Sequence, residues 1–212
     1  MNKIKLKDAE ARFLAEYPEG FSDPRMLEIA KKHKVEQMNK LAQESFAIQE
    51  FKNPSKIVES MAKVVSRSSL VSVFEKPKFR DLTKALNSDE KERLSQGLKE
   101  FLHGNQGFGF DLMCDLLNEY KLAKWTLLTV CPIYYRPDTE VYVKPNTTKW
   151  IITHFELDGV KYNPKPTYEF YRAYRDQINR MKAETAASLQ VSNAAFTGFL
   201  MMSMHADTPN DA

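Results

Sequence analysis

Basic and aromatic side chains gather between Tyr120 and Lys182 of this sequence. The segment holds eleven lysines and arginines against six aspartates and glutamates, together with eight of the nine tyrosines and both tryptophans. In grooves that bind single-stranded nucleic acid, cations contact the phosphates and flat rings stack on the bases. The pattern therefore predicts a surface for nucleic acid or another anionic ligand, formed by Arg136, Lys144, Lys149, Tyr171, Arg172, Tyr174, Arg175 and Lys182.

The helix predicted from an N-cap at Thr167 to about residue 187 shows this combination best. On a helical projection its aromatic face, with Tyr171 and Tyr174, adjoins a basic face with Arg172 and Arg175. Two interpretations stay open. Aromatic residues at helical spacing are more often core, which would make the basic stripe a solvated flank. An exposed row of both tyrosines would instead indicate binding.

A second candidate surface is the apolar stretch from Val191 to Met204, which is rich in small residues and methionines. Methionine-rich helices adapt well to partners, so this stretch predicts contact with a protein partner or a second copy of the chain. Burial in the core is the alternative. The residues expected to make the contact are Phe196, Phe199, Leu200 and Met201, and the polar tail from His205 is expected to be disordered.

Arrangements typical of catalysis or metal binding are missing from the sequence. Cys114 and Cys131 form no CxxC pair and are expected to be reduced thiols, and the four histidines are scattered. No serine lies in a Gly-x-Ser-x-Gly turn. We therefore expect no metal and no cofactor, and the catalytic residues stay unknown. An enzyme would need a site assembled from distant tyrosines, arginines and His154, so a binding or assembly role is favoured.

Composition limits the class of protein. With 42% hydrophobic and 28% charged residues, the chain falls in the ordinary globular range. Its net charge of +3 is nearly balanced, so any basic surface must be local. No apolar run approaches the roughly 20 residues that span a bilayer, and the N-terminus has no apolar signal region. These features predict a cytoplasmic protein without a membrane partner.

The spacing of apolar residues predicts a mainly α (α+β) fold, dominated by helices. Helices are expected over residues 7–17, 24–51, 89–102, 110–120 and 121–130, the last ending before Pro132. Beyond this point alternating residues predict short strands at 140–144 and 160–162, forming a small two-stranded β element. We expect a helical subdomain over 1–105, a mixed basic and aromatic subdomain over 106–190, and an apolar helix with its tail over 191–212.

Overall fold

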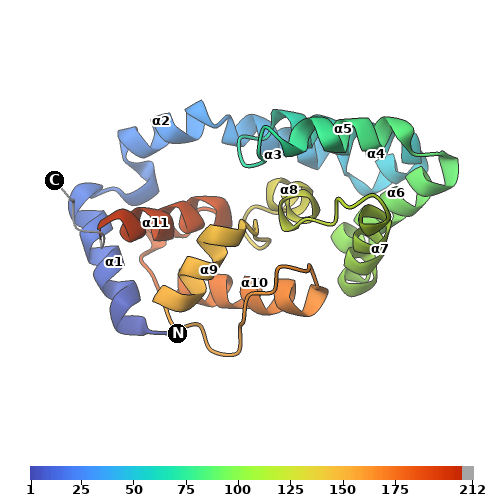
Figure 1. Cartoon of the computed structure of the whole chain (residues 1–212). Helices are drawn as coiled ribbons and strands as arrows, with labels where there is room; N and C mark the ends of the chain where they lie inside the picture. The colour runs from blue at the N-terminus through green and yellow to red at the C-terminus, as the bar shows by residue number, and fades with distance from the viewer. Residues whose placement is uncertain (207–212) are drawn as a thin grey trace.

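The computed structural model describes residues 1–206, with the side chains of residues 1–203. Within this range the chain forms eleven α-helices and three short 3-10 helices, and no strand (Figure 1). The helix-dominated prediction is confirmed, and the predicted two-stranded β element is wrong. Most of the predicted disordered tail lies outside the described residues.

The helices follow one another with short connections. In chain order they are α1 (Lys3–Glu16), η1 (Gly20–Ser22), α2 (Pro24–Lys32), α3 (Val35–Ser45), η2 (Ile48–Lys52), α4 (Pro54–Arg67), α5 (Glu75–Ala85), α6 (Ser88–His103), α7 (Gln106–Glu119), α8 (Trp125–Tyr135), α9 (Pro145–His154), α10 (Tyr168–Ala183), η3 (Ala187–Leu189) and α11 (Asn193–Ala206). No helix among residues 1–206 has both the length and the apolar character needed to cross a membrane.

Two predicted helix starts agree with the structure to within a residue. The Thr167 hydroxyl accepts a hydrogen bond from the backbone N–H of Phe170 at 3.4 Å, so it caps α10 as expected. At α6 the cap is Asn87, which forms a capping box with Glu90. These starts are set by side chains within three residues of the helix end, so local sequence suffices to predict them.

The segment from Glu140 to Val143 is extended, as its alternation suggested, but it pairs with no strand. Its polar backbone groups bond to side chains instead. The N–H of Val141 donates to the Tyr171 hydroxyl at 3.4 Å, and the N–H of Val143 donates to the Thr129 hydroxyl at 3.1 Å. All four residues are buried between helices. Side-chain partners satisfy the backbone here without a β ladder. The two polar members of the alternation have partners of their own, because Glu140 accepts from Tyr171 and Tyr142 donates to the Leu70 carbonyl.

Two predicted helix ends were wrong. The expected helix over 24–51 breaks at Lys34, which adopts a left-handed conformation (φ 54°) and separates α2 from α3. The helix expected to end before Pro132 continues through it to Tyr135. Proline removes one helical hydrogen bond, but residues 125–134 are all buried, and α8 packs against α3 and α4. Packing outweighs the local preference here.

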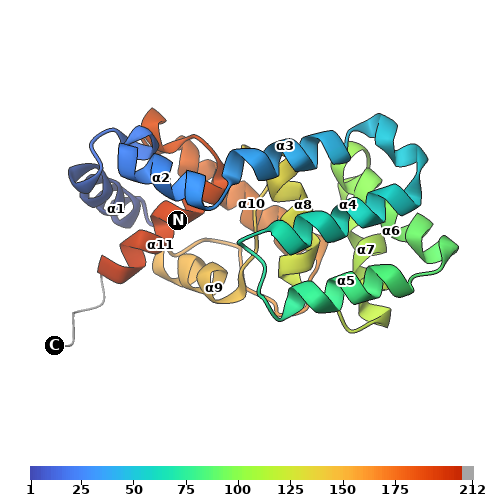
Figure 2. The same cartoon turned by 90° about the horizontal axis from the view of Figure 1, so that it is seen from above.

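The elements form two groups on either side of α8. In Figures 1 and 2, α4 to α7 lie together at one end, while α1, α9 and α11 lie at the other. The first group is closely packed, because Gly109 on α7 has no room for a side chain: a Cβ there would lie 2.3 Å from the Phe101 backbone nitrogen on α6. In the second group α1 packs against α11. The helix α2 lies near α1, and α3 continues from it toward α4 in the other group (Figure 2).

Candidate functional site

The two tyrosines of the predicted binding surface are core residues. Tyr171 and Tyr174 are 0% and 1% exposed. Their rings belong to an aromatic cluster, where Tyr171 stacks on Phe110 at 5.8 Å and Tyr174 stacks on Phe170 at 6.0 Å. Neither ring can stack on a base in this conformation. This corrects the binding interpretation of the α10 aromatic face, which forms part of the scaffold.

A buried polar cluster, formed by Gln106, Glu140, Tyr171 and Arg175, explains how the α10 face is buried. The Tyr171 hydroxyl donates to Glu140 Oε2 at 2.6 Å, and Arg175 Nη1 lies 3.3 Å from the same oxygen. Gln106 donates to Glu140 Oε1 at 3.1 Å and accepts from Arg175 at 2.7 Å. The side chains of Glu140 and Arg175 are only 4% and 15% exposed. The charges of this Glu140 cluster are therefore balanced inside the protein, and Arg175 is committed to an internal partner.

The Glu140 cluster also changes the ionisation of Tyr171. Burial and the neighbouring Glu140 carboxylate together raise the pKa of Tyr171 well above its usual value. The phenol therefore stays protonated and donates its hydrogen bond. Neither of the two cavities described below is lined by a residue of this cluster. The arrangement holds the extended segment against α7 and α10.

Two more of the predicted cations bind backbone carbonyls and thereby hold the loop after α8 in place. Lys182 Nζ donates to the Asp138 carbonyl at 2.6 Å, and Arg136 donates to the carbonyl of Leu102. Asn179 donates to the Thr139 carbonyl at 2.9 Å. These bonds tie the loop to α10 and α6. Arg136 and Lys182 therefore act within the fold, although Arg136 is also exposed.

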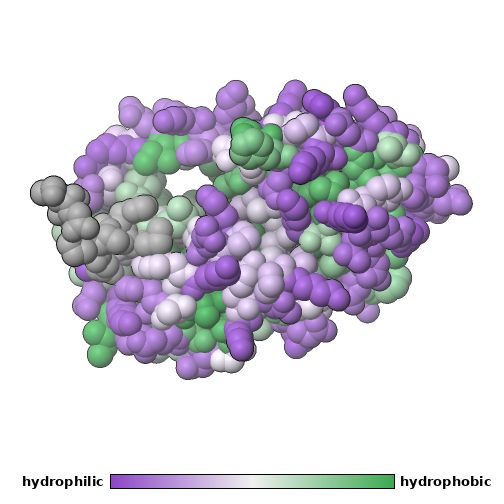
Figure 3. All heavy atoms as spheres, in the orientation of Figure 1, coloured by the Kyte–Doolittle hydropathy of each residue, from purple (hydrophilic) through white to green (hydrophobic). Residues whose placement is uncertain are grey.

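The remaining predicted cations, Lys144, Lys149 and Arg172, are exposed. Lys144 precedes α9 and Lys149 lies on it, whereas Arg172 lies on α10. The structure therefore does not bring the eight predicted residues together. It keeps two lysines at α9, where hydrophilic side chains cover the front of the molecule (Figure 3).

One of these lysines, Lys149, contacts an aromatic ring that follows α9 in the chain. Lys149 Nζ lies 5.0 Å from the ring centre of Tyr162, which is a cation–π contact. Lys161 is exposed beside Tyr162 in the chain, and Trp150 is half-buried beside Lys149. We call Lys144, Lys149, Trp150, Lys161 and Tyr162 the α9 face. None of its lysines has a carboxylate within salt-bridge distance among the described residues.

The carboxylates nearest in sequence to the α9 face are already paired elsewhere. Lys5 bonds Glu156 at 2.8 Å, and the amino group of Met1 bonds Asp158. Both contacts lower the pKa of these carboxyl groups, chiefly through the hydrogen bonds. Their charge is therefore compensated by α1 and the residues before it. Within residues 1–203, the lysines of the α9 face are left as uncompensated positive charge.

Sequence reasoning did not select Trp150, Lys161 and Tyr162 as site residues. All three lie within the segment from Tyr120 to Lys182, whose enrichment in basic and aromatic residues indicated the region but not these particular residues. The missing information was the contact between α9 and the chain that follows it, because Lys149 and Tyr162 are thirteen positions apart. No helical or strand period relates residues at that separation.

The predicted interaction residues of the C-terminal helix are also mostly internal. Phe196, Phe199 and Leu200 are 0% exposed. Phe199 meets Phe13 of α1 edge-on at 5.2 Å. The half-buried Met201 accepts a hydrogen bond from the Thr147 hydroxyl at 3.7 Å. The alternative of core burial holds for the three buried residues, because α1 covers this face.

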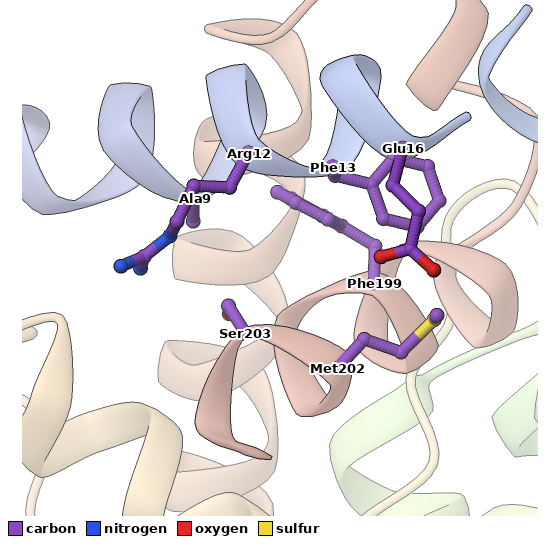
Figure 4. Close-up of a pocket in the computed structure, with 7 residues that line it drawn as sticks. All are labelled: Ala9, Arg12, Phe13, Glu16, Phe199, Met202 and Ser203. Atoms are coloured by element: carbon purple, nitrogen blue, oxygen red, sulfur yellow. The ribbon is translucent and has the colours of Figure 1, made fainter. Parts of the chain in front are cut away.

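A small cavity remains between α1 and α11 (Figure 4). Its volume is about 50 Å³, and its lining includes Phe13, Glu16, Phe199 and Met202. Ligand pockets usually measure about 300–1,000 Å³. The cavity is therefore too small for a typical cofactor or substrate, and it marks a packing gap between the two helices.

Groups that could support catalysis lie apart. Burial raises the pKa of both Cys114 and Cys131, so neither is activated as a thiolate. His154 stacks on Trp150 with 4.4 Å between ring centres. No group of three or more potential metal ligands occurs within the described part of the chain. Comparison with known proteins adds nothing to this picture, since no family model, no curated protein and no solved structure matches the chain.

Proposed function

We propose that the protein binds single-stranded nucleic acid on the α9 face. The observation that carries this proposal is the uncompensated charge of Lys144, Lys149 and Lys161 beside the aromatic rings of Trp150 and Tyr162. Lysines supply contacts to phosphates, and rings supply stacking that tolerates any base. This proposal keeps the ligand class that the sequence favours and moves the surface from α10 to α9.

The contact between Lys149 and Tyr162 supports an arrangement that is ready to bind. The ring holds the ammonium group at the surface without neutralising it, because a cation–π contact leaves the charge in place. A phosphate can then approach Lys149 while a base stacks on the half-exposed part of Tyr162 or Trp150. The binding energy would be mostly electrostatic, so the affinity should fall steeply with salt.

The test is fluorescence anisotropy with a labelled single-stranded oligonucleotide over a series of salt concentrations. For single strands the slope of log K against log salt changes by roughly 0.7 for each phosphate contact. The double variant Lys149→Ala with Lys161→Ala should therefore make the slope shallower by about 1.4. A matched control is Lys52→Ala with Lys84→Ala, two exposed lysines on η2 and α5, away from α9 (Figure 2).

The control pair should leave the slope unchanged, and both double variants should melt with the parent protein. Absence of binding at low salt would refute the proposal. Equal slopes for the two double variants would show that binding follows total charge and has no specific site. Stacking is tested separately by the tryptophan fluorescence, which should be quenched when the oligonucleotide is added and Trp150 contacts a base.

A further inference from the structure

The helix α2 is an amphipathic helix whose apolar side is only partly covered, with Met26 packed against the core. It has no buried residue, and Leu27 and Ile29 are 47% and 43% exposed. Figure 3 shows an opening beneath this helix, between it and α11. Most amphipathic helices bury their apolar stripe on the protein that carries them. Leu27 and Ile29 therefore leave part of the apolar side of α2 open to contact.

Both ends of α2 are fixed, so the surface is held in place. At its start Arg25 forms an ion pair with Asp23 at 3.0 Å and lies over the Tyr17 ring at 4.4 Å. Directly after its end His33 Nδ1 and the Ser69 hydroxyl lie 2.9 Å apart. Between these two ends Met26 packs against the core. A ligand would therefore bind to a surface of α2 that is already ordered, which reduces the conformational entropy that the protein loses on binding.

The helix α2 and its neighbour α3 form an open groove of about 500 Å³. Its lining is Ala30, Val35, Glu36, Asn39, Lys40 and Gln43. On α3, Asn39 and Gln43 lie one turn apart and therefore on the same side of the helix. The Asn39 side chain makes no hydrogen bond with the described residues, and that of Gln43 makes only a long one, 3.4 Å to the Tyr135 carbonyl.

These amides match the backbone of an extended peptide. A side-chain amide offers a carbonyl acceptor and an NH₂ donor, the same pair of groups that each peptide unit presents. From Val35 to Gln43 the helix rises by about 12 Å, which equals about four residues of an extended chain at 3.3 Å each. The groove can therefore accompany about four residues of a peptide, with aliphatic contacts on the α2 side.

The charges at the corner between α2 and α3 indicate the sign of the partner. Lys31, Lys32 and Lys34 are exposed, and none has a carboxylate within salt-bridge distance among residues 1–203. Lys40 contacts Glu44 only at 3.9 Å. Glu36 is the acidic residue of the lining. Lys31 and Lys34 are the chain neighbours of the lining residues Ala30 and Val35, so this corner offers positive charge to the carboxylates of a peptide.

We infer that the groove between α2 and α3 binds an extended segment of a partner protein in which aliphatic and acidic residues alternate. The aliphatic side chains contact Ala30 and Val35 of the lining, the backbone bonds to the amides of Asn39 and Gln43, and the carboxylates meet the lysines of the corner. This site is separate from the α9 face, and the inference does not depend on nucleic-acid binding.

The test uses two pools of fluorescent hexapeptides and the full chain. In the first pool glutamate alternates with positions randomised among leucine, isoleucine, valine and phenylalanine, and in the second lysine replaces glutamate. Only the acidic pool should bind. Asn39→Ala should weaken binding about tenfold, because one polar contact to the backbone is lost. Asn118→Ala, on the exposed surface of α7, is the matched control and should have no effect.

A second pair of variants tests the charge. Lys31→Glu with Lys32→Glu should weaken binding of the acidic pool by tenfold or more, whereas Lys52→Glu should not. Bound peptide should also slow amide exchange in α2 and α3. Thermal melts establish that each variant is folded. These results would support the inference, and an excess of oligonucleotide should not displace the peptide.

Other occupants of the groove would overturn the inference. If neither pool binds, or if both bind equally, the groove does not select an acidic peptide. A gain of helical circular dichroism by the bound peptide would show a helical ligand in place of an extended one. A dimer in sedimentation velocity that Asn39→Ala dissolves would show that a second copy of the chain fills the groove.

Discussion

At the scale of single residues, the hydroxyl of Tyr171 links α10 to two neighbouring residues of the extended segment. It donates to Glu140 on the extended segment, accepts from the N–H of Val141, and belongs to α10. A buried carboxylate is costly unless donors surround it. The hydroxyl of Tyr171 therefore stabilises the fold in addition to the packing of its ring.

Removing this hydroxyl should destabilise the protein. We expect Tyr171→Phe to lower the free energy of unfolding by about 1–3 kcal/mol, because Glu140 loses its closest donor. Urea denaturation monitored by circular dichroism gives this value. The control Tyr162→Phe removes the hydroxyl of a half-buried tyrosine at the surface and should cost less than about 0.5 kcal/mol. Equal losses for the two variants would contradict the role assigned to the hydroxyl.

Alkaline pH should act through four buried tyrosines. Burial raises the pKa of Tyr134, Tyr142, Tyr171 and Tyr174 above the usual value near 10. Because the folded pKa is the higher one, their contribution to stability is complete below about pH 10 and is lost as the pH rises further. Tyrosinate absorbance should therefore increase in two stages. The second stage should coincide with loss of helical circular dichroism; ionisation of all nine tyrosines before unfolding would contradict this expectation.

At the scale of elements, α2 and α4 offer a direct contrast. Both are amphipathic, but α4 buries its apolar side chains Ile57, Met61 and Val64, whereas α2 buries none. Local opening costs little where few apolar contacts are lost. The amides of α2 should therefore exchange with deuterium much faster than those of α4, as mass spectrometry of peptic peptides can measure. Equal protection would mean that α2 contacts something that covers it.

Which elements the sequence predicts well depends on how far away their determinants lie. The cap at Thr167 and the apolar stripe of α10 are local, so the start of α10 was predicted correctly, although the helix ends at Ala183 and not at about residue 187. The environment of Tyr171 was not, because its partner Glu140 is 31 positions away. The helical spacing of Tyr171 and Tyr174 is the same whether these tyrosines lie in the core or at the surface, so spacing alone does not decide between the two. The extended segment and the course of α8 through Pro132 likewise depend on neighbours remote in sequence.

At the scale of the whole molecule, positive charge is divided between surfaces that local composition does not separate. The basic segment between Tyr120 and Lys182 contains both Arg175, which is neutralised internally, and Lys149, which is not. Counting charges therefore overstated the surface charge of α10. The sequence suggests the double variant Arg172→Ala with Arg175→Ala as a test of nucleic-acid binding. In the structure this variant removes a partner of Glu140, so it should lower the melting temperature.

Because α1 packs against α11, the protein should stay assembled when the chain is cut between them. Besides the contact between Phe13 and Phe199, Lys3 bonds Glu184 at 2.8 Å and Lys5 bonds Glu156 at 2.8 Å. These contacts bind the first helix to late parts of the chain without help from α2. A single tryptic nick at Lys31 or Lys32 should therefore yield two fragments on a denaturing gel that elute together in size exclusion. Fragments that separate would show that α2 is an indispensable tether; fragments that stay together would make the protein a natural candidate for reconstitution from two separately expressed pieces.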